Sequence, residues 1–266
     1  MKKHTILLLF VISITLTFMS LCATSCKKSS NGTADSGTFY FHLHTNIADS
    51  TIADSLTYYS DTLGRYLALT VPQFFISDIM LINASGNMVS MGNVHILKGL
   101  DSEDYVIGKA PVGTYIAAMF NVGLDASTNA LPPTTNFTPN SWLPESGMWY
   151  GSTSMGYMAM KVQGMYDTTA THSGLNPINF SFEIPNSMTS STSITLPNRG
   201  TGAWTGYPIY VLTKGGTQYV HIICDYAKLM SVLNLKTQNM TDGMNTNVSI
   251  ATMLAAQVPN MFRYEQ

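Results

Sequence analysis

Charged side chains are scarce in this sequence. Asp, Glu, Lys and Arg make up 11% of the 266 residues, and the formal net charge is −2, whereas soluble domains typically carry about 25% charged residues. A protein that holds nucleic acid electrostatically shows a basic face. This composition offers none, so no nucleic-acid partner is expected.

Cysteine is rare as well. Only Cys22, Cys26 and Cys224 occur, and the first two belong to the N-terminal segment described below. Cys224 is thus left without a partner for an internal disulfide. It ends an apolar run that starts at Val220, where a cysteine usually serves as a small buried hydrophobic residue.

The common catalytic signatures are missing too. The sequence has no G-x-S-x-G elbow, no phosphate-binding glycine loop with its lysine, no H-E-x-x-H and no C-x-x-C. The acidic residues fall mostly in expected turns, and no pair suited to general acid–base work can be picked out. We therefore expect a protein that is not an enzyme.

No apolar run reaches the ~20 residues that a membrane-spanning helix needs. The run Ile6–Met19 follows the basic residues Lys2 and Lys3, as in a secretory signal peptide. The segment ends at Ala23-Thr24-Ser25-Cys26, which resembles the lipobox of bacterial lipoproteins. We expect a signal peptide over residues 1–25, lipidation of Cys26, and a flexible Ser/Gly/Asn-rich tether over residues 26–37.

Lipidation would hold the protein to a membrane without a spanning helix. Lys27 and Lys28 follow the cysteine in place of an aspartate. The expected location is therefore the cell envelope, as an outer-membrane lipoprotein facing either the periplasm or the cell surface.

The remainder, residues 38–266, alternates between apolar and polar residues in short segments. Phe39–His44 is the clearest example, with Phe39, Phe41 and Leu43 on one face of a strand. Further strands are predicted at Tyr66–Val71, Phe74–Ile82, Asn93–Leu97, Tyr115–Val122, Tyr157–Val162, Ile178–Ile184, Ile209–Leu212 and Gln218–Cys224. Short helices are predicted at Tyr226–Leu233, capped by Asp225, and at Ser249–Val258.

Many strands and few helices predict an all-β fold, specifically a two-sheet antiparallel β-sandwich of the immunoglobulin-like type. The turn Lys214-Gly215-Gly216 predicts a hairpin between the last two strands. The proline-rich stretch Leu124–Ser146 is predicted to be a long loop across one end of the sandwich.

Two histidines in the first strand are candidate metal ligands. His42 and His44 are two residues apart, so in a strand both side chains project from the same face, ~6.5–7 Å apart at Cβ. Imidazole pairs of this kind suit copper or zinc. The alternative is two polar residues on a solvated strand face. His221 would approach the same metal only if its strand lies beside the first.

A methionine-rich stretch with aromatic neighbours is a second candidate. Thioethers prefer Cu(I), but methionine also fills irregular cores, and the core interpretation is favoured here. The stretch contains Met148, Met155, Met158, Met160 and Met165. Trp149 and Tyr150 could contact a carbohydrate or protein ligand, or could cover the core.

Several segments, taken in order, resemble the MbnP-like family of exported proteins, in a form similar to a Bacteroidota lipoprotein subgroup. The matching segments are Phe41–Asn46, Gly64-Arg65, Gln73–Leu81, Asn83–Gly86, Val112–Tyr115, Phe120–Asp125 with Asn129, Met148–Gly151, Gly156-Tyr157, Gly164, Asp225–Leu229 and Met261-Phe262. They span nearly the whole mature chain.

The resemblance implies a β-sandwich, an envelope location and, for some members, copper bound by histidines and a modified tryptophan. It also implies partners such as a dihaem peroxidase-like enzyme, and a TonB-dependent transporter would fit metal handling. The chain departs from the family pattern at Tyr150, where a second tryptophan is missing, and at Glu183, where copper-binding members carry a histidine. The resemblance leaves His42, His44 and Trp149 as candidate ligands.

The expected function is therefore copper binding in the envelope by a lipid-anchored domain. The alternative is a carbohydrate- or protein-binding surface module that uses Trp149 and Tyr150.

Overall fold

The computed structural model describes residues 35–55, 57–133, 147–169, 171–172, 174, 176–189, 193–196 and 209–265. The predicted signal peptide, Cys26 and all but the last three residues of the predicted tether lie outside this part of the chain, as do residues 134–146 of the predicted loop Leu124–Ser146. The first strand begins at Ser36, two residues before the predicted start of the domain. No helix in the described residues is long and apolar enough to cross a membrane.

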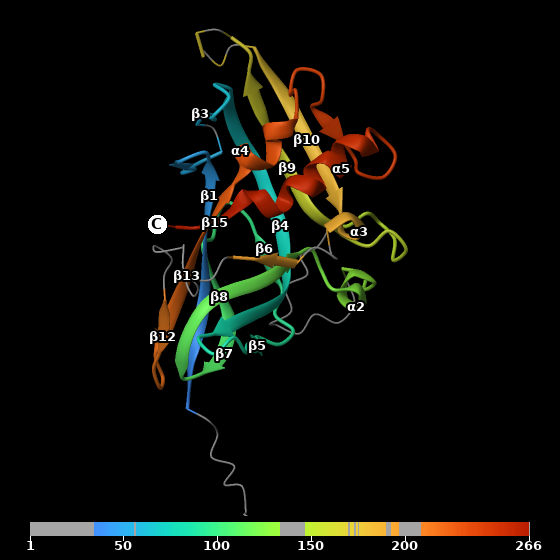
Figure 1. The fold of residues 1–266 in the computed structure, drawn as a ribbon. Coiled ribbons are helices and arrows are strands. Elements are labelled where there is room, and N and C mark those ends of the chain that lie inside the picture. Colours follow the sequence, from blue (N-terminus) through green and yellow to red (C-terminus); the bar gives the residue numbers. More distant parts are fainter. Residues whose placement is uncertain are drawn as a thin grey trace, which may run out of the picture. The chain divides into compact units, whose positions relative to one another are not determined.

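Strands dominate the described residues (Figure 1). They are β1 (Ser36–Ile47), β2 (Ser50–Thr51), β3 (Tyr59–Ser60), β4 (Tyr66–Asn83), β5 (Met88–Ser90), β6 (Ile96–Lys98), β7 (Asp104–Pro111), β8 (Gly113–Val122), β9 (Met158–Asp167), β10 (Pro177–Pro185), β11 (Ser193–Thr195), β12 (Tyr210–Leu212), β13 (Thr217–Asp225), β14 (Met240–Thr241) and β15 (Phe262–Tyr264). The predicted all-β class is confirmed.

The helices are short. They are α2 (Ala126–Asn129), α3 (Asn186–Thr189), α4 (Tyr226–Leu229), α5 (Val248–Gln257), and the 3₁₀ turns η1 (Met230–Val232) and η2 (Val258–Met261). Both predicted helices are present, and Asp225 caps α4 as expected, accepting hydrogen bonds from the backbone N–H groups of Ala227 and Lys228. The α2 turn lies at the start of the predicted long loop.

The strands form two sheets. The five-stranded sheet has the order β15-β13-β1-β2, with β7 also paired to β1. The ten-stranded sheet has the order β11-β8-β4-β9-β10-β14, with β12 paired to β8 and β3, β5 and β6 paired to β4. The sheets are mixed, because β1 pairs with β13 in parallel and β10 pairs with β14 in parallel. The other strand pairings are antiparallel, as predicted, and these two parallel pairings are the correction to the predicted antiparallel sandwich.

The larger of two apolar clusters in the described residues, the main core, lies between the two sheets. Phe39, Phe41 and Leu43 of β1 are fully buried and share this core with Phe120 of β8. The rings of Phe41 and Phe120 pack edge to face, with centroids 5.7 Å apart. Because side chains alternate along a strand, burying Phe41 and Leu43 turns His42 and His44 to the outer face of the five-stranded sheet.

The strand β4 corrects one prediction. The segments predicted as two strands, Tyr66–Val71 and Phe74–Ile82, form one long strand that continues through Pro72. A register shift between Leu69 and Val71 in the pairing with β9 accommodates the proline, since proline is tolerated in a sheet at such irregularities. The proline was therefore not a strand boundary.

The predicted hairpin at Lys214-Gly215-Gly216 also requires correction. β12 pairs with β8 in the ten-stranded sheet, whereas β13 pairs with β1 and β15 in the five-stranded sheet. The turn therefore passes the chain from one sheet to the other. Its backbone bonds to the start of β1, through Gly215 N–H to Ser36 O and Thr38 N–H to Gly216 O.

One strand of the site was not predicted. β7 reads Asp104-Tyr-Val-Ile-Gly-Lys-Ala-Pro, and its alternation between buried and exposed residues breaks at Gly108. Gly108 has a φ of +133° and pairs with Phe39 at a register shift in β1. A bulge moves the side chains after it to the opposite phase, which hides the period of two in the sequence.

Candidate metal centre

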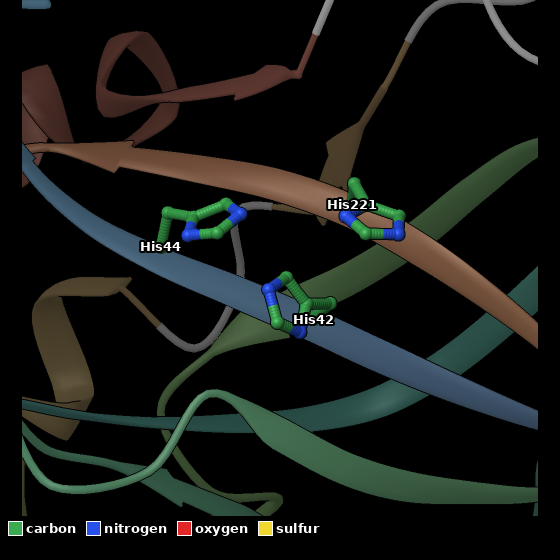
Figure 2. Close-up of side chains that lie close together, drawn as sticks. All are labelled: His42, His44 and His221. Carbon is green, nitrogen blue, oxygen red and sulfur yellow. The ribbon is translucent and has the colours of Figure 1, made fainter. Parts of the chain in front are cut away.

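Three imidazoles meet on the outer face of the five-stranded sheet (Figure 2). His42 and His44 project from β1, and His221 projects from β13, which runs parallel to it. The register of this pair sets His42 directly opposite His221. The strand of His221 therefore lies beside the first strand, as its approach to the same metal requires.

The geometry of the three rings is compact. Nitrogen atoms offered by the three side chains all lie within 4.8 Å of one another, and the ring centroids of His42 lie 4.4 Å from His44 and 4.7 Å from His221. Two nitrogens bound to one ion at ~2.0–2.1 Å each can be up to ~4.2 Å apart. Small side-chain rotations thus bring all three imidazoles within reach of a single ion.

Carboxylates surround these imidazoles. Asp104 Oδ1 lies 2.5 Å from His42 Nδ1, and Glu103 contacts both His42 Nε2 at 3.4 Å and His44 Nδ1 at 3.2 Å. Glu265 Oε2 lies 3.3 Å from His44 Nε2 and 3.0 Å from His221 Nδ1. Each histidine therefore has at least one acidic neighbour, and two of the acids bridge between histidines.

The surroundings of His221 Nδ1 also support an ion at this position. His221 Nδ1 is shielded from solvent and makes no aligned hydrogen bond, although Glu265 lies 3.0 Å away. Buried polar atoms normally have a partner. An ion bound to the cluster would supply an aligned partner, and imidazole nitrogens beside carboxylates are a donor set that suits copper or zinc.

The site is open enough for an ion to enter. The side chains of His42, His44 and His221 are 20%, 16% and 45% exposed. An open pocket of about 450 Å³ adjoins them at Glu265 and is otherwise lined by Asn46, Asp49, Thr51, Ile223, Arg263 and Tyr264.

A buried lysine holds the turn that presents the acids. Lys98, at the end of β6, is fully buried, and its Nζ donates hydrogen bonds to Gly99 O at 2.5 Å and Ser102 O at 2.8 Å. Burial lowers the pKa of Lys98, against the opposing effects of Cys224, Glu103 and Asp101. The backbone carbonyl of Glu103 also accepts from Leu43 N–H of β1, so the acid is fixed beside the histidines from both sides.

Trp149 and Tyr150 lie away from the three histidines. They pack on a second apolar cluster around Phe75, Leu124, Met148, Tyr157 and Met158. Phe74 faces the main core, so by alternation Phe75 and this cluster lie on the outer face of the ten-stranded sheet. The structure therefore separates Trp149 from His42 and His44, which occupy the outer face of the other sheet.

Both aromatic residues are engaged in this cluster. The ring of Trp149 packs on Tyr157, with centroids 4.6 Å apart, and the Tyr150 hydroxyl donates to Asp242 O at 3.1 Å. Burial, reinforced by Glu183 and Asp242, raises the pKa of Tyr150. Tyr150 and Glu183, the two departures from the family pattern, are thus near neighbours.

The other described histidines and the methionine-rich stretch lie apart from the three-histidine cluster. His95 lies 2.7 Å from Asp125 Oδ2, and exposed His172 stacks on Tyr66 with ring centroids 3.6 Å apart. In the methionine-rich stretch, Met148, Met158 and Met160 are buried among apolar residues, as the core interpretation predicted, whereas Met155 is exposed and Met165 is half-buried.

Sequence reasoning missed the acidic members of the site. Glu103 and Asp104 adjoin each other at the start of β7, and Glu265 follows β15 near the end of the chain. The adjacent pair of acids was a visible signal, but nothing in the sequence assigned it to the strand beside His42.

Comparison with known proteins supports the family resemblance. The family model described as MbnP matches residues 36–249. Among solved structures, MbnP from Methylosinus trichosporium is similar with a TM-score of 0.49 and 10% sequence identity, covering 74% of this chain and 78% of that one. The search of curated proteins returned no match.

Proposed function

The chain belongs to the MbnP family, and we propose that its domain binds copper in the cell envelope through His42, His44 and His221. The protein acts by binding and handling the ion and not as an enzyme. The partner carried over from the family resemblance is a dihaem peroxidase-like enzyme, which in copper-binding members modifies the tryptophan. A TonB-dependent transporter would fit the handling of the metal.

The observation that carries the proposal is the parallel register of β1 and β13, which sets His42 opposite His221. The i and i+2 spacing then adds His44 on the same face. Three imidazoles on two neighbouring strands form a site with little conformational freedom, because the strands are the rigid elements of the sheet.

Copper content tests the proposal directly. The purified full chain is equilibrated with copper, separated from free metal by gel filtration and analysed by mass spectrometry. We expect about one ion per chain, lost in a variant with His42→Ala, His44→Ala and His221→Ala together. His172→Ala is the matched control, since His172 is exposed and stacked on Tyr66, and it should retain the metal.

Equal copper content in the triple variant and the unaltered chain would refute the proposal. If Trp149→Ala abolished the capture of a carbohydrate or protein while metal binding made no difference, the alternative function as a binding module would hold instead. The packing of Trp149 on Tyr157 favours a role in covering the second cluster.

The envelope location rests on Cys26. Acylation of this thiol, together with cleavage between Ser25 and Cys26, would anchor the mature chain. We expect the unaltered protein in the membrane fraction with fatty acid on residue 26, and Cys26→Ser in the soluble fraction. Mass spectrometry of the N-terminal peptide checks this, and an unmodified cysteine in the mature protein would contradict it.

A further inference from the structure

We infer that the histidine site selects a divalent ion, with Cu(II) bound most tightly and Zn(II) next, and that Glu103, Asp104 and Glu265 make this selection against Cu(I). The inference rests on the proposed function and specifies the oxidation state of the metal that the site accepts.

The negative charge around the histidines favours a divalent ion. Three carboxylates lie within 2.5–3.4 Å of imidazole nitrogens. The attraction between an ion and these acids grows in proportion to the charge of the ion. A divalent ion therefore gains twice what a monovalent ion gains from the same three groups.

The donor atoms of the site also favour a divalent ion. Cu(I) prefers thiolate and thioether sulfur, whereas imidazole and carboxylate suit divalent copper and zinc. Cys224 is fully buried in the core between the sheets, three residues along β13 from His221. The site thus presents nitrogen and oxygen to an ion, and the thiol of its own strand faces away.

The carboxylates also orient the imidazole rings toward an ion. A carboxylate that accepts a hydrogen bond from one imidazole nitrogen fixes the tautomer and makes the other nitrogen a better ligand. Asp104 stands 2.5 Å from His42 Nδ1, which leaves His42 Nε2 for the ion. Glu103 and Glu265 each contact two histidines, so each can either orient imidazoles or bind the ion itself.

The fold holds these three acidic residues in position. Lys98 anchors the turn before Glu103 through two backbone carbonyls, and Asp104 is fixed in register opposite His42. Glu265 follows β15, and its backbone N–H bonds to His221 O. All three acids are therefore placed by backbone contacts and not only by their own side chains.

The test compares both oxidation states on the same variants. Affinities of the full chain for Cu(II) and Zn(II) are measured in air by chelator competition, and the affinity for Cu(I) is measured anaerobically. Glu103→Gln and Glu265→Gln keep size and hydrogen bonding but remove charge. Asp49→Asn is the matched control, because Asp49 lines the adjoining pocket and pairs with Arg263 instead of a histidine.

We expect each Gln variant to lose about 10–100-fold in Cu(II) affinity, the usual effect of removing a supporting carboxylate, with a smaller loss for Zn(II) and little change for Cu(I). The reduction potential of the bound copper should rise by about 59 mV for each tenfold selective loss of Cu(II) affinity. Asp49→Asn should behave like the unaltered chain.

The outcomes separate the two proposals. If the histidine variants abolish binding but the Gln variants leave Cu(II) affinity and potential unchanged, the inference fails while the proposed function holds. Tighter binding of Cu(I) than of Cu(II) by the unaltered chain would also overturn the inference. If the chain binds no copper in either state, both fail.

Discussion

At the scale of single residues, burial sets the reactivity of Cys224. Cys224 is fully buried, and burial raises the pKa of its thiol to about 12, with Lys98 opposing and Glu103 reinforcing the shift. Since the thiolate is the reactive form, this cysteine should be inert in the folded protein, which agrees with its assignment as a small hydrophobic residue.

Alkylation tests this. The peptide that contains Cys224 should remain unmodified when the folded protein is treated with iodoacetamide in mildly alkaline buffer, and should be fully modified in concentrated guanidinium. Rapid labelling under native conditions would show that the strand β13 opens readily.

Burial of the Glu183 carboxyl group disfavours its charged form. Burial raises the pKa of its carboxyl group, Lys161 at 3.9 Å opposes the shift, and Asp242 adds to it. The folded state therefore binds more protons than the unfolded state between the ordinary pKa of 4.5 and the raised value. This contribution to stability is lost as the pH rises through that window.

The prediction for Glu183 concerns a difference between two pH values. Glu183→Gln should raise the melting temperature at neutral pH, where the glutamate is charged, and the gain should shrink near pH 4, where the glutamate is protonated. Thermal unfolding of both proteins at the two pH values measures this. A loss of stability at neutral pH would mean that the contact with Lys161 outweighs the burial of the charge.

At the scale of elements, the site depends on how β1 is held at its start. Gly37 leaves no room for a side chain, because a Cβ there would lie 2.6 Å from Gly216 O and 2.8 Å from Thr213 O. The same turn bonds to Ser36 and Thr38. The glycine is thus required by the close approach of the turn between β12 and β13 to the start of β1.

Gly37→Ala should therefore lower the free energy of unfolding by about 1–3 kcal/mol, as overpacking usually does. Denaturant unfolding measures the change. Gly99→Ala is the control, since among the described residues, its chain neighbours apart, a Cβ there would meet only Gln73 Cγ at 4.0 Å, and it should be close to neutral. Equal effects of the two substitutions would contradict the packing argument.

At the scale of the whole molecule, the candidate ligands come from distant parts of the chain. They belong to β1, to the turn and start of β7, to β13 and to the segment after β15 (Figure 1). The unfolded chain cannot hold them together, so an ion that binds this cluster binds mainly the folded state. Binding must then stabilise the fold by mass action.

Thermal unfolding measures this coupling. At a free Cu(II) concentration 100 times the dissociation constant, the fold should gain about 2.7 kcal/mol, which for a domain of this size corresponds to roughly 5–10 °C in melting temperature. The chain with all three histidines replaced should show no such gain. A gain of equal size in that variant would place the ion elsewhere.

The sequence by itself determined the period of the side chains. Alternation along Phe39–His44 was enough to predict a strand and to put His42 and His44 on one face, and Asp225 was enough to place the start of α4. These are local properties, because the direction of each side chain and the satisfaction of helix-end N–H groups depend on residues a few positions away.

Only the tertiary structure decided which strands are neighbours. The parallel pairing of β1 with β13 brought His221 to the site, the pairing with β7 brought Asp104, and the separation of the two sheets moved Trp149 away. Strand pairing is made by backbone groups that are alike in every residue except proline. No local pattern therefore names the partner, and the packing of the whole core selects it.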